Sequence, residues 1–246
     1  MISKNTAKFI KSLQIKKYRQ KENAFPVEGA KNVLELLKSD FVIHKLFLTR
    51  QFIERFDKEV AVGDFPHTVV TETELSKVSA HKTNNAALAI AEMKRNEGID
   101  FDAGEYGIVL DDIRDPGNLG TIIRIADWYG IGKIICSESS ADQYNPKAIS
   151  ATMGSFTRVK VSYQPLATYL PGLSMPILGT YLEGENVHRF DFPETGLILV
   201  GNESVGISPS LEVLVSHKLH IPRFGGAESL NAGMATAVIC DNLRRR

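Results

Sequence analysis

The stretch from Leu219 to Leu243 constrains the fold more than any other part of this 246-residue chain. Its letters, LHIPRFGGAESLNAGMATAVICDNL, predict a short strand into Ile221 and Pro222, a glycine-containing loop, and then a helix of small and apolar residues. Asn231 is placed to cap that helix, and Ser229 is expected to satisfy another of its free N–H groups. The first two helical turns carry little side-chain bulk, so another helix or a ligand can approach the backbone closely. By itself the stretch also fits an ordinary strand, loop and helix of an α/β domain.

In two earlier stretches, polar residues and glycines likewise follow a predicted strand: DDIRDPGNLGTIIRIADW at 111–128 and LVGNESVGI at 199–207. Ligands of open α/β sheets gather at the carboxyl ends of strands, so we expect Asn118 and Arg124 to lie on a loop and first helix that face a site. Arg124 stands among aliphatic residues, which favours either an ion pair, with Asp115 or Asp127, or an anion as its target. No GxGxxG follows a predicted strand, which argues against a standard dinucleotide or Rossmann-type methyl-donor site.

The charge distribution indicates a possible RNA contact near the N-terminus. Lys and Arg total 29, as do Asp and Glu, so the overall balance decides nothing. The first 21 residues, however, hold seven basic residues and no acidic one. They form either a phosphate-contacting patch or a solvated basic terminus. Two interpretations stay open for Lys17, Tyr18 and Arg19. Either the two cations contact phosphates and the tyrosine ring stacks on a base, or the three residues end a helix and their side-chain stems pack on the domain.

The two cysteines, Cys136 and Cys240, stand in apolar runs and are expected to be core thiols of a reducing compartment. No CxxC or histidine-rich cluster indicates a metal site. The N-terminus lacks the apolar core of a signal peptide, and no apolar run approaches about 18 residues. We therefore expect a soluble, cytoplasmic protein without a membrane segment.

Strand and helix patterns alternate along the chain, which predicts two α/β domains, at 1–95 and 104–246, with the polar segment 93–105 between them. Residues 86–91 form an apolar element of undecided type. The expected helices are 7–13, 30–38, 51–56, 72–78 and 119–129, and the expected strands are a short one at 24–29, then 42–48, 67–70, 107–110, 133–136, 176–181 and 197–200.

Taken together, the three stretches resemble the signature motifs of the SpoU (TrmH-type) RNA ribose 2′-O-methyltransferases, in the SPOUT superfamily. The first matches D-P-x-N-x-G-x-x-x-R-x-A, the second G-N-E-x-x-G-I and the third I-P-x-x-G-x-x-x-S-L-N. The resemblance implies a C-terminal SPOUT α/β domain with a deep trefoil knot that binds S-adenosylmethionine. It also implies a homodimer and, from the weaker motifs K-K-Y-R and F-x-V-E-G, a preceding L30e-like RNA substrate-binding domain.

The same resemblance assigns roles to individual residues. The catalytic set it implies is Arg124, Asn118, Glu203, Ser229 and Asn231. The cofactor-binding set is Gly179, Thr180, Gly201, Asn202, Ile221 and Leu230. The RNA-binding set is Lys16, Lys17 and Arg19. A guanidinium, whose pKa is above about 12, is a poor base, so we expect Arg124 to clamp a phosphate and stabilise oxyanion character. Ser150 stands where many relatives have arginine, which removes one phosphate contact.

The expected activity is methylation of a ribose 2′-hydroxyl in RNA, with ribosomal RNA as the expected target and transfer RNA as the alternative. A non-catalytic RNA-binding relative is a second interpretation, and the intact catalytic set argues against it. A small-molecule α/β enzyme is a third, disfavoured by the missing dinucleotide motif and the lack of a nucleophile–base pair. The three histidines of the second half are scattered and are expected to be surface or core residues: His188, His217 and His220.

Overall fold

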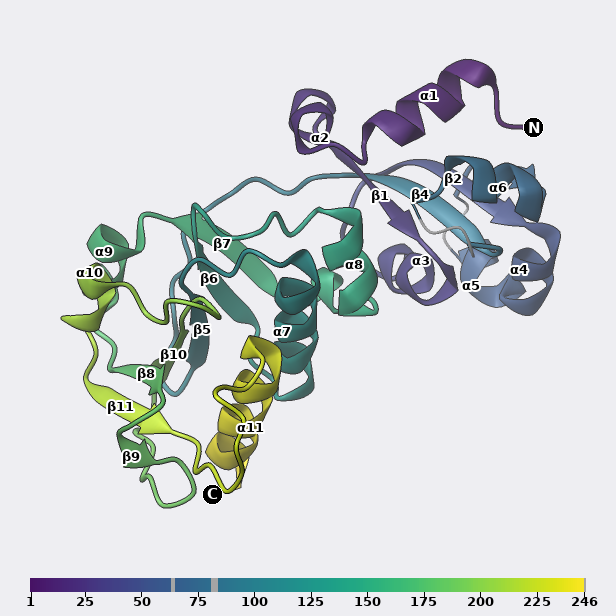
Figure 1. The fold of residues 1–246 in the computed structure, drawn as a ribbon. Helices are drawn as coiled ribbons and strands as arrows, with labels where there is room; N and C mark the ends of the chain where they lie inside the picture. Colours follow the sequence, from purple (N-terminus) through teal and green to yellow (C-terminus); the bar gives the residue numbers. More distant parts are fainter. Residues whose placement is uncertain (63–64, 81–83, 246) are drawn as a thin grey trace. The chain divides into compact units, whose positions relative to one another are not determined.

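The computed structural model describes residues 1–62, 65–80 and 84–245. These residues form two compact units, each with its own sheet (Figure 1). Unit 1 comprises Met1–Arg95 and Asp142–Thr157, and unit 2 comprises Asn96–Ala141 and Arg158–Arg246. Residues 142–157, which follow the first motif in the sequence, thus pack within the unit that begins at the N-terminus.

Unit 1 has a four-stranded sheet in the order β1-β4-β2-β3, in which only β2 and β3 are parallel. The strands are β1 (Ala24–Glu28), β2 (Ile43–Thr49), β3 (Thr68–Val70) and β4 (Ala87–Glu92). The helices are α1 (Lys4–Ser12), α2 (Lys16–Glu22), α3 (Ala30–Leu37), α4 (Arg50–Arg55), α5 (Asp57–Val62), α6 (Glu72–Val78) and α8 (Pro146–Thr152), followed by the 3₁₀ turn η1 (Ser155–Thr157).

Alternation along β4 explains why this sheet is covered on both faces. Ala87, Ala89 and Ala91 point into a core shared with α3, α4 and α8, whereas Leu88 and Ile90 point into a core shared with α1 and α6. Successive side chains of a strand face opposite sides, so a strand that is apolar throughout requires two layers of helices. The element left undecided by the sequence is therefore a central strand.

Unit 2 has a sheet of seven described strands in the order β7-β6-β5-β10-β8-β11-β9, and all neighbouring strands in it run parallel. The strands are β5 (Tyr106–Leu110), β6 (Lys133–Ser137), β7 (Lys160–Gln164), β8 (Ile177–Tyr181), β9 (Glu185–Asn186), β10 (Gly196–Val200) and β11 (His217–His220). The helices are α7 (Pro116–Trp128), α9 (Leu166–Tyr169), α10 (Pro209–Glu212) and α11 (Ala232–Arg244), with the 3₁₀ turn η2 (Leu170–Leu173).

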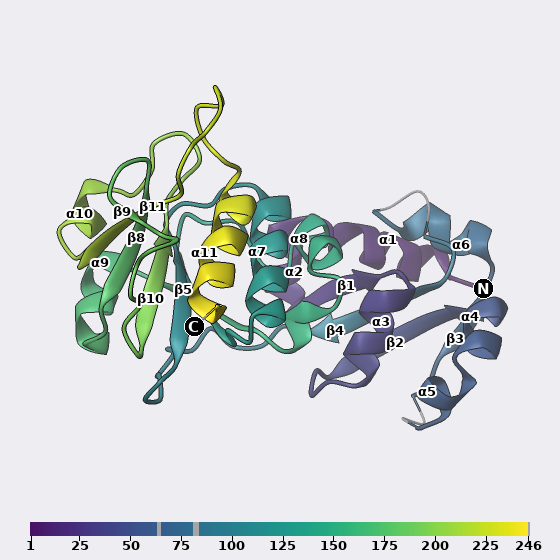
Figure 2. The same cartoon turned by 90° about the horizontal axis from the view of Figure 1, so that it is seen from below.

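Helices α7 and α11 lie side by side on one face of this sheet (Figures 1 and 2). Their apolar residues join Ile108, Leu110 and Ile198 in one core, while Val109 and Leu199 point to the opposite face and pack with α9 and α10. The sequence predicts the α/β class of this unit, and the structure adds that its sheet is parallel. The expected strand into Ile221 and Pro222 ends earlier, at His220, and the first-motif helix begins earlier, at Pro116, because a proline suits the first turn of a helix.

Both cysteine predictions are confirmed in this unit: Cys136 and Cys240 are buried and unpaired. No helix in the described part of the chain is long and apolar enough to cross a membrane.

Candidate active site

The three sequence motifs follow the carboxyl ends of three strands of the unit 2 sheet. Strand β5 leads into residues 111–115 and α7, β10 leads into the loop at 201–206, and β11 leads into the loop at 221–230 and α11. The order β5-β10-β8-β11 and the parallel pairing place all these ends at one edge of the sheet. The expectation that Asn118 lies at such an edge is therefore met, because it stands in the first turn of α7.

One polar side chain from each motif joins a continuous hydrogen-bonded chain. Asn118 Nδ2 donates to Glu203 Oε1 at 2.5 Å, and Asn231 Nδ2 donates to Asn118 Oδ1 at 2.9 Å. Asn231 Oδ1 accepts from the N–H of Gly233 at 3.0 Å, so Asn231 caps α11 as predicted. We call Glu203, Asn118 and Asn231 the polar triad. Ser229 does not take the capping role expected of it, because its exposed side chain bonds no described residue.

Two aspartates at the end of β5 tie the first motif to the second, and the sequence did not single them out. Asp111 Oδ2 accepts from the N–H of Ser208 at 2.7 Å, and the carbonyl of Asp112 accepts from Asn202 Nδ2 at 2.8 Å. Asp112 has φ +57°, a left-handed conformation that few residues except glycine, asparagine and aspartate adopt. The Arg114 guanidinium, hydrogen-bonded to the Asp112 carboxylate, holds the pKa of that carboxyl below its usual value.

Gly201 is required by the way the second motif folds back on itself. A Cβ at this position would lie 2.3 Å from the carbonyl carbon of Gly206 and 2.4 Å from the nitrogen of Ile207. Asn202 and Gly206 exchange two backbone hydrogen bonds, at 3.0 and 2.9 Å, which close this loop. Gly201 is therefore required because the backbone of Gly206 and Ile207 occupies the space that a side chain would fill. Gly179 likewise makes room for its neighbours, since a Cβ there would meet the Tyr181 ring at 2.7 Å.

Arg124 lies on the exposed surface of α7 and forms no ion pair with any described residue. The two carboxylates proposed as its partners are engaged elsewhere. Asp127 binds Arg158, with the closest atoms 2.7 Å apart, and Asp115 caps α7 by accepting from the N–H of Asn118 at 2.9 Å. The ion-pair alternative for Arg124 is therefore wrong in this structure. The guanidinium is available to an anion.

The remaining cofactor candidates stand on the strand-end loops. Thr180 is half-buried one residue before the end of β8, Ile221 is half-buried after β11, and Leu230 is 51% exposed. Two further apolar side chains project from these loops, Leu182 at 75% and Val205 at 78% exposed. The backbone N–H groups of residues 223–230 donate to no described residue. This edge therefore offers both apolar surface and free hydrogen-bond donors.

The basic segment of unit 1 is the helix α2, and its residues differ in exposure. Lys16 and Lys17 are exposed, as expected of RNA contacts. Arg19 is not: its side chain is 1% exposed, and its guanidinium bonds Asp142 at 2.5 Å and the carbonyl of Leu13 at 2.9 Å. The prediction that Arg19 contacts RNA is corrected accordingly, because a buried and paired guanidinium presents nothing to a phosphate. Ser150 lies half-buried in α8.

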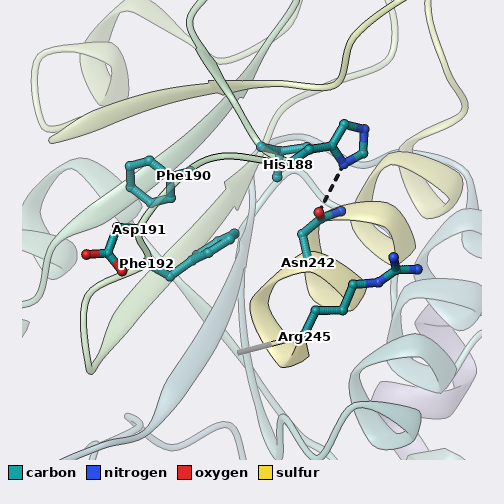
Figure 3. A pocket seen from close by; sticks show the side chains of 7 residues that line it. His188, Phe190, Asp191, Phe192, Asn242 and Arg245 are labelled. Carbon is teal, nitrogen blue, oxygen red and sulfur yellow. Dashed lines mark hydrogen bonds between the residues drawn. The ribbon is translucent and has the colours of Figure 1, made fainter.

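A cavity of about 390 Å³ lies elsewhere in unit 2, between residues 187–192 and the end of α11 (Figure 3). His188 Nδ1 and Asn242 Oδ1 are 3.0 Å apart at its wall. None of its lining residues belongs to the three motifs. Among the residues that the structure describes, no group of three or more His, Cys, Asp or Glu side chains is arranged to hold a metal ion.

Both parts of the chain match models of known protein families. The model of the SpoU rRNA Methylase family matches residues 105–241, and that of the MRM3-like substrate binding domain matches residues 4–89. The 23S rRNA (guanosine(2553)-2'-O)-methyltransferase RlmP of Bacillus subtilis is 29% identical over 238 residues, covering 95% of this chain and 94% of that protein.

Two solved structures are similar along the whole chain. A putative RNA methyltransferase of the TrmH family from Porphyromonas gingivalis has a TM-score of 0.85 and 31% identity, covering 100% of this chain and 99% of that one. The AdoMet-bound rRNA methyltransferase from Sinorhizobium meliloti has a TM-score of 0.87 and 27% identity, covering 100% of this chain and 97% of that one.

Proposed function

The chain belongs to the SpoU rRNA Methylase family, and from this membership we infer that it methylates a ribose 2′-hydroxyl of ribosomal RNA with S-adenosylmethionine. The observation that carries the inference is the polar triad, in which Asn118 of the first motif is hydrogen-bonded to Glu203 of the second and to Asn231 of the third. The relative RlmP is named for this reaction on 23S rRNA.

The strand-end loops of unit 2 fit the cofactor. S-adenosylmethionine needs apolar surface for its adenine and hydrogen-bond donors for its polar groups. The exposed Leu182, Val205 and Leu230 supply the first, and the free N–H groups of residues 223–230 supply the second. We assign adenine packing to these side chains and backbone contacts to Thr180, Gly201, Asn202 and Ile221. When bound, the cofactor supplies a sulfonium methyl group for transfer to oxygen.

The chain's own residues must position a poor nucleophile and stabilise the charge that develops on it. Glu203 is held by Asn118 through one carboxylate oxygen, so its other oxygen remains able to accept the ribose hydroxyl. Arg124 carries an exposed guanidinium whose fork geometry suits a phosphate and whose charge stabilises oxyanion character. Asn231, which caps α11 and donates to Asn118, orders the loop that precedes it. Ser229 has an exposed hydroxyl that is free to contact the substrate. A hydroxyl held within about 3.5 Å of the methyl group gains most of its reactivity from this orientation.

The two units divide the work of binding and chemistry. Unit 1, which matches a substrate-binding domain, is proposed to have the L30e-like fold and to hold RNA through Lys16 and Lys17 on α2. Residues 104–246, apart from residues 142–157, which pack in unit 1, are proposed to form the SPOUT domain, with the trefoil knot in its strand-end loops. A cytoplasmic location accords with the two reduced, buried thiols.

We also propose that the protein is a homodimer through α7 and α11. Trp128 on α7 is 82% exposed, and Met234 on the neighbouring α11 is 60% exposed. Large apolar side chains that project from adjacent helices are typical of surfaces covered by a partner.

The deciding experiment is transfer of tritiated methyl groups to unmodified ribosomal and transfer RNA. We expect label on ribosomal RNA at a position whose 3′ linkage resists alkaline hydrolysis, since a 2′-O-methyl group blocks that cleavage. Arg124→Ala should lower transfer about 100- to 1000-fold. Arg189→Ala, which removes an exposed arginine of the same unit outside the motifs, should leave transfer near the wild-type level. Label on transfer RNA alone would identify transfer RNA, and not ribosomal RNA, as the substrate. Label on a base would refute ribose methylation. Calorimetric titration that detects no S-adenosylmethionine binding at millimolar ligand would refute the enzyme.

A further inference from the structure

The loop between β11 and α11 presents an aromatic ring to solvent. Phe224 is 95% exposed, whereas the other eleven phenylalanines of the chain are buried or half-buried. A ring in this position contributes almost nothing to burial in the folded monomer. Its role therefore lies in what it contacts outside the chain.

The neighbours of Phe224 leave that ring open to a ligand. A Cβ added to Gly225 or Gly226 would meet no atom within 4 Å, so the loop tip is free of packing. Arg223 is exposed, and its Nη1 donates to the carbonyl of Ala227 at 3.3 Å across the loop. The segment thus carries a cation beside an aromatic ring, with small residues after them.

The loop is anchored next to the polar triad. It leaves the sheet at His220 and ends at Asn231, whose side chain donates to Asn118. Phe224 lies seven residues before Asn231 in the sequence. The ring therefore belongs to a loop whose far end is fixed in the proposed catalytic site.

We propose that Phe224 stacks on an unpaired base of the substrate RNA near the reacting ribose, with Arg223 contacting a phosphate beside it. The proposal rests on the proposed function, because it takes RNA as the substrate. Proteins recognise single-stranded RNA by stacking splayed bases on aromatic rings and by pairing arginine with the backbone. A protein-binding hot spot instead sits among other well-packed contacts, which glycines and a lone cation do not offer. Phe224 is thus a specificity residue that selects an unpaired nucleotide.

The test measures RNA affinity separately from methyl transfer. Fluorescence anisotropy would give the dissociation constant of a labelled, unmodified transcript of large-subunit ribosomal RNA for wild type and for Phe224→Ala, Phe224→Leu and Phe224→Tyr. Val213→Ala is the matched control, because Val213 is an apolar residue of the same unit that is 81% exposed. Calorimetry with S-adenosylmethionine and sedimentation of each variant run in parallel.

We expect Phe224→Ala and Phe224→Leu to weaken RNA binding about tenfold, and Phe224→Tyr and the control to remain near wild type, since stacking needs a ring and not merely an apolar side chain. Unchanged RNA affinity in Phe224→Ala, or a Leu variant equal to wild type, overturns the proposal. So does a loss confined to cofactor affinity, which would place the ring on adenine, or a change in sedimentation mass, which would place it in a dimer interface. Wild type that binds RNA but transfers no methyl group would refute the proposed function and leave this measurement decisive.

Discussion

Replacing Asp142 with asparagine should destabilise unit 1 and leave unit 2 intact. Asp142 Oδ2 accepts from Arg19 at 2.5 Å, while its Oδ1 accepts from the N–H of Tyr144 at 2.9 Å. The Arg19 side chain is 1% exposed and that of Asp142 is 16% exposed. Asparagine keeps the shape, but its single oxygen can serve only one of these two donors. If that oxygen keeps the Tyr144 contact, the substitution removes both the charge that compensates Arg19 and the acceptor of its hydrogen bond.

The expected cost follows from the burial of the cation. Breaking a buried ion pair by removing one partner costs about 3–5 kcal/mol, because the remaining charge is left uncompensated. Other hydrogen bonds of Arg19 can compensate little for this loss, since its Nε already lacks a partner among the described residues. Asp142 retains some solvent contact, so we expect the lower end of the range, about 3 kcal/mol. That is a large share of a folding free energy of roughly 5–15 kcal/mol.

Hydrogen exchange with mass spectrometry is the suitable assay, because it reports opening free energies for each part of the chain. Peptides from β1 and β4 should lose about 3 kcal/mol of protection in Asp142→Asn, and peptides from β5 and β10 should lose none. The matched control is Asp40→Asn, which breaks the Lys94–Asp40 pair, also 2.5 Å long but with side chains 46% and 75% exposed. An exposed pair is worth about 0–1 kcal/mol.

Equal effects of the two substitutions would refute the reasoning, since each converts an aspartate 2.5 Å from a cation to asparagine and the two sites differ in burial. Adding Arg19→Met to Asp142→Asn should recover part of the loss, because the uncompensated cation is then removed. If Arg19→Met instead left stability unchanged and weakened RNA binding alone, Arg19 would be an RNA contact after all.

Four further predictions concern the site and the core. Arg124→Ala should lower kcat about 100- to 1000-fold in the methyl-transfer assay, and Arg124→Lys should stay well below wild type, because an ammonium lacks the bidentate fork; a fully active lysine variant would leave only a charge role. Asp112→Gly should retain stability within about 1 kcal/mol in urea denaturation, since glycine adopts φ +57° freely, whereas Asp112→Val should lose more. Burial raises the pKa of Cys240 to about 12, and both cysteines are buried. A thiol reagent at pH 8 should therefore label neither cysteine in the native protein and both in denaturant. Labelling of the native protein would contradict the core placement. Trp128→Glu should reduce a sedimentation mass of two chains to one, and a wild-type mass of one chain would exclude the homodimer.

The elements with strong local patterns were predictable from the sequence. Helices α3, α7 and α11 and strands β2, β5, β6, β8 and β10 lie within a few residues of the predicted bounds, because each carries its own periodicity and end signals. The strand β7 was not predicted, since its residues alternate in polarity only over KVSYQ and lack turn signals. The membership of residues 142–157 in unit 1 was equally inaccessible, because it depends on tertiary packing of residues such as Tyr144 and Phe156.

Arg19 shows why local reasoning fails for polar residues. Its neighbours in the sequence are Lys16, Lys17 and Lys21, which favour an exposed basic helix. Its burial is decided by a carboxylate 123 residues away. A cation can enter a core only when such a partner is present, and a partner at that separation leaves no trace in local spacing.

The polar triad is the part of the site where local and long-range information meet. The capping roles of Asn231 and Asp115 are local and follow from the sequence, but Asn118 meets Glu203 and Asn231 across separations of 85 and 113 residues. With both ends of its amide used, Asn118 has a fixed orientation and holds one oxygen of Glu203. Among the described charged side chains of the triad and α7, the second Glu203 oxygen and the Arg124 guanidinium have no partner. One is an acceptor suited to a hydroxyl and the other a cationic donor suited to a phosphate, and a nucleotide offers both groups side by side.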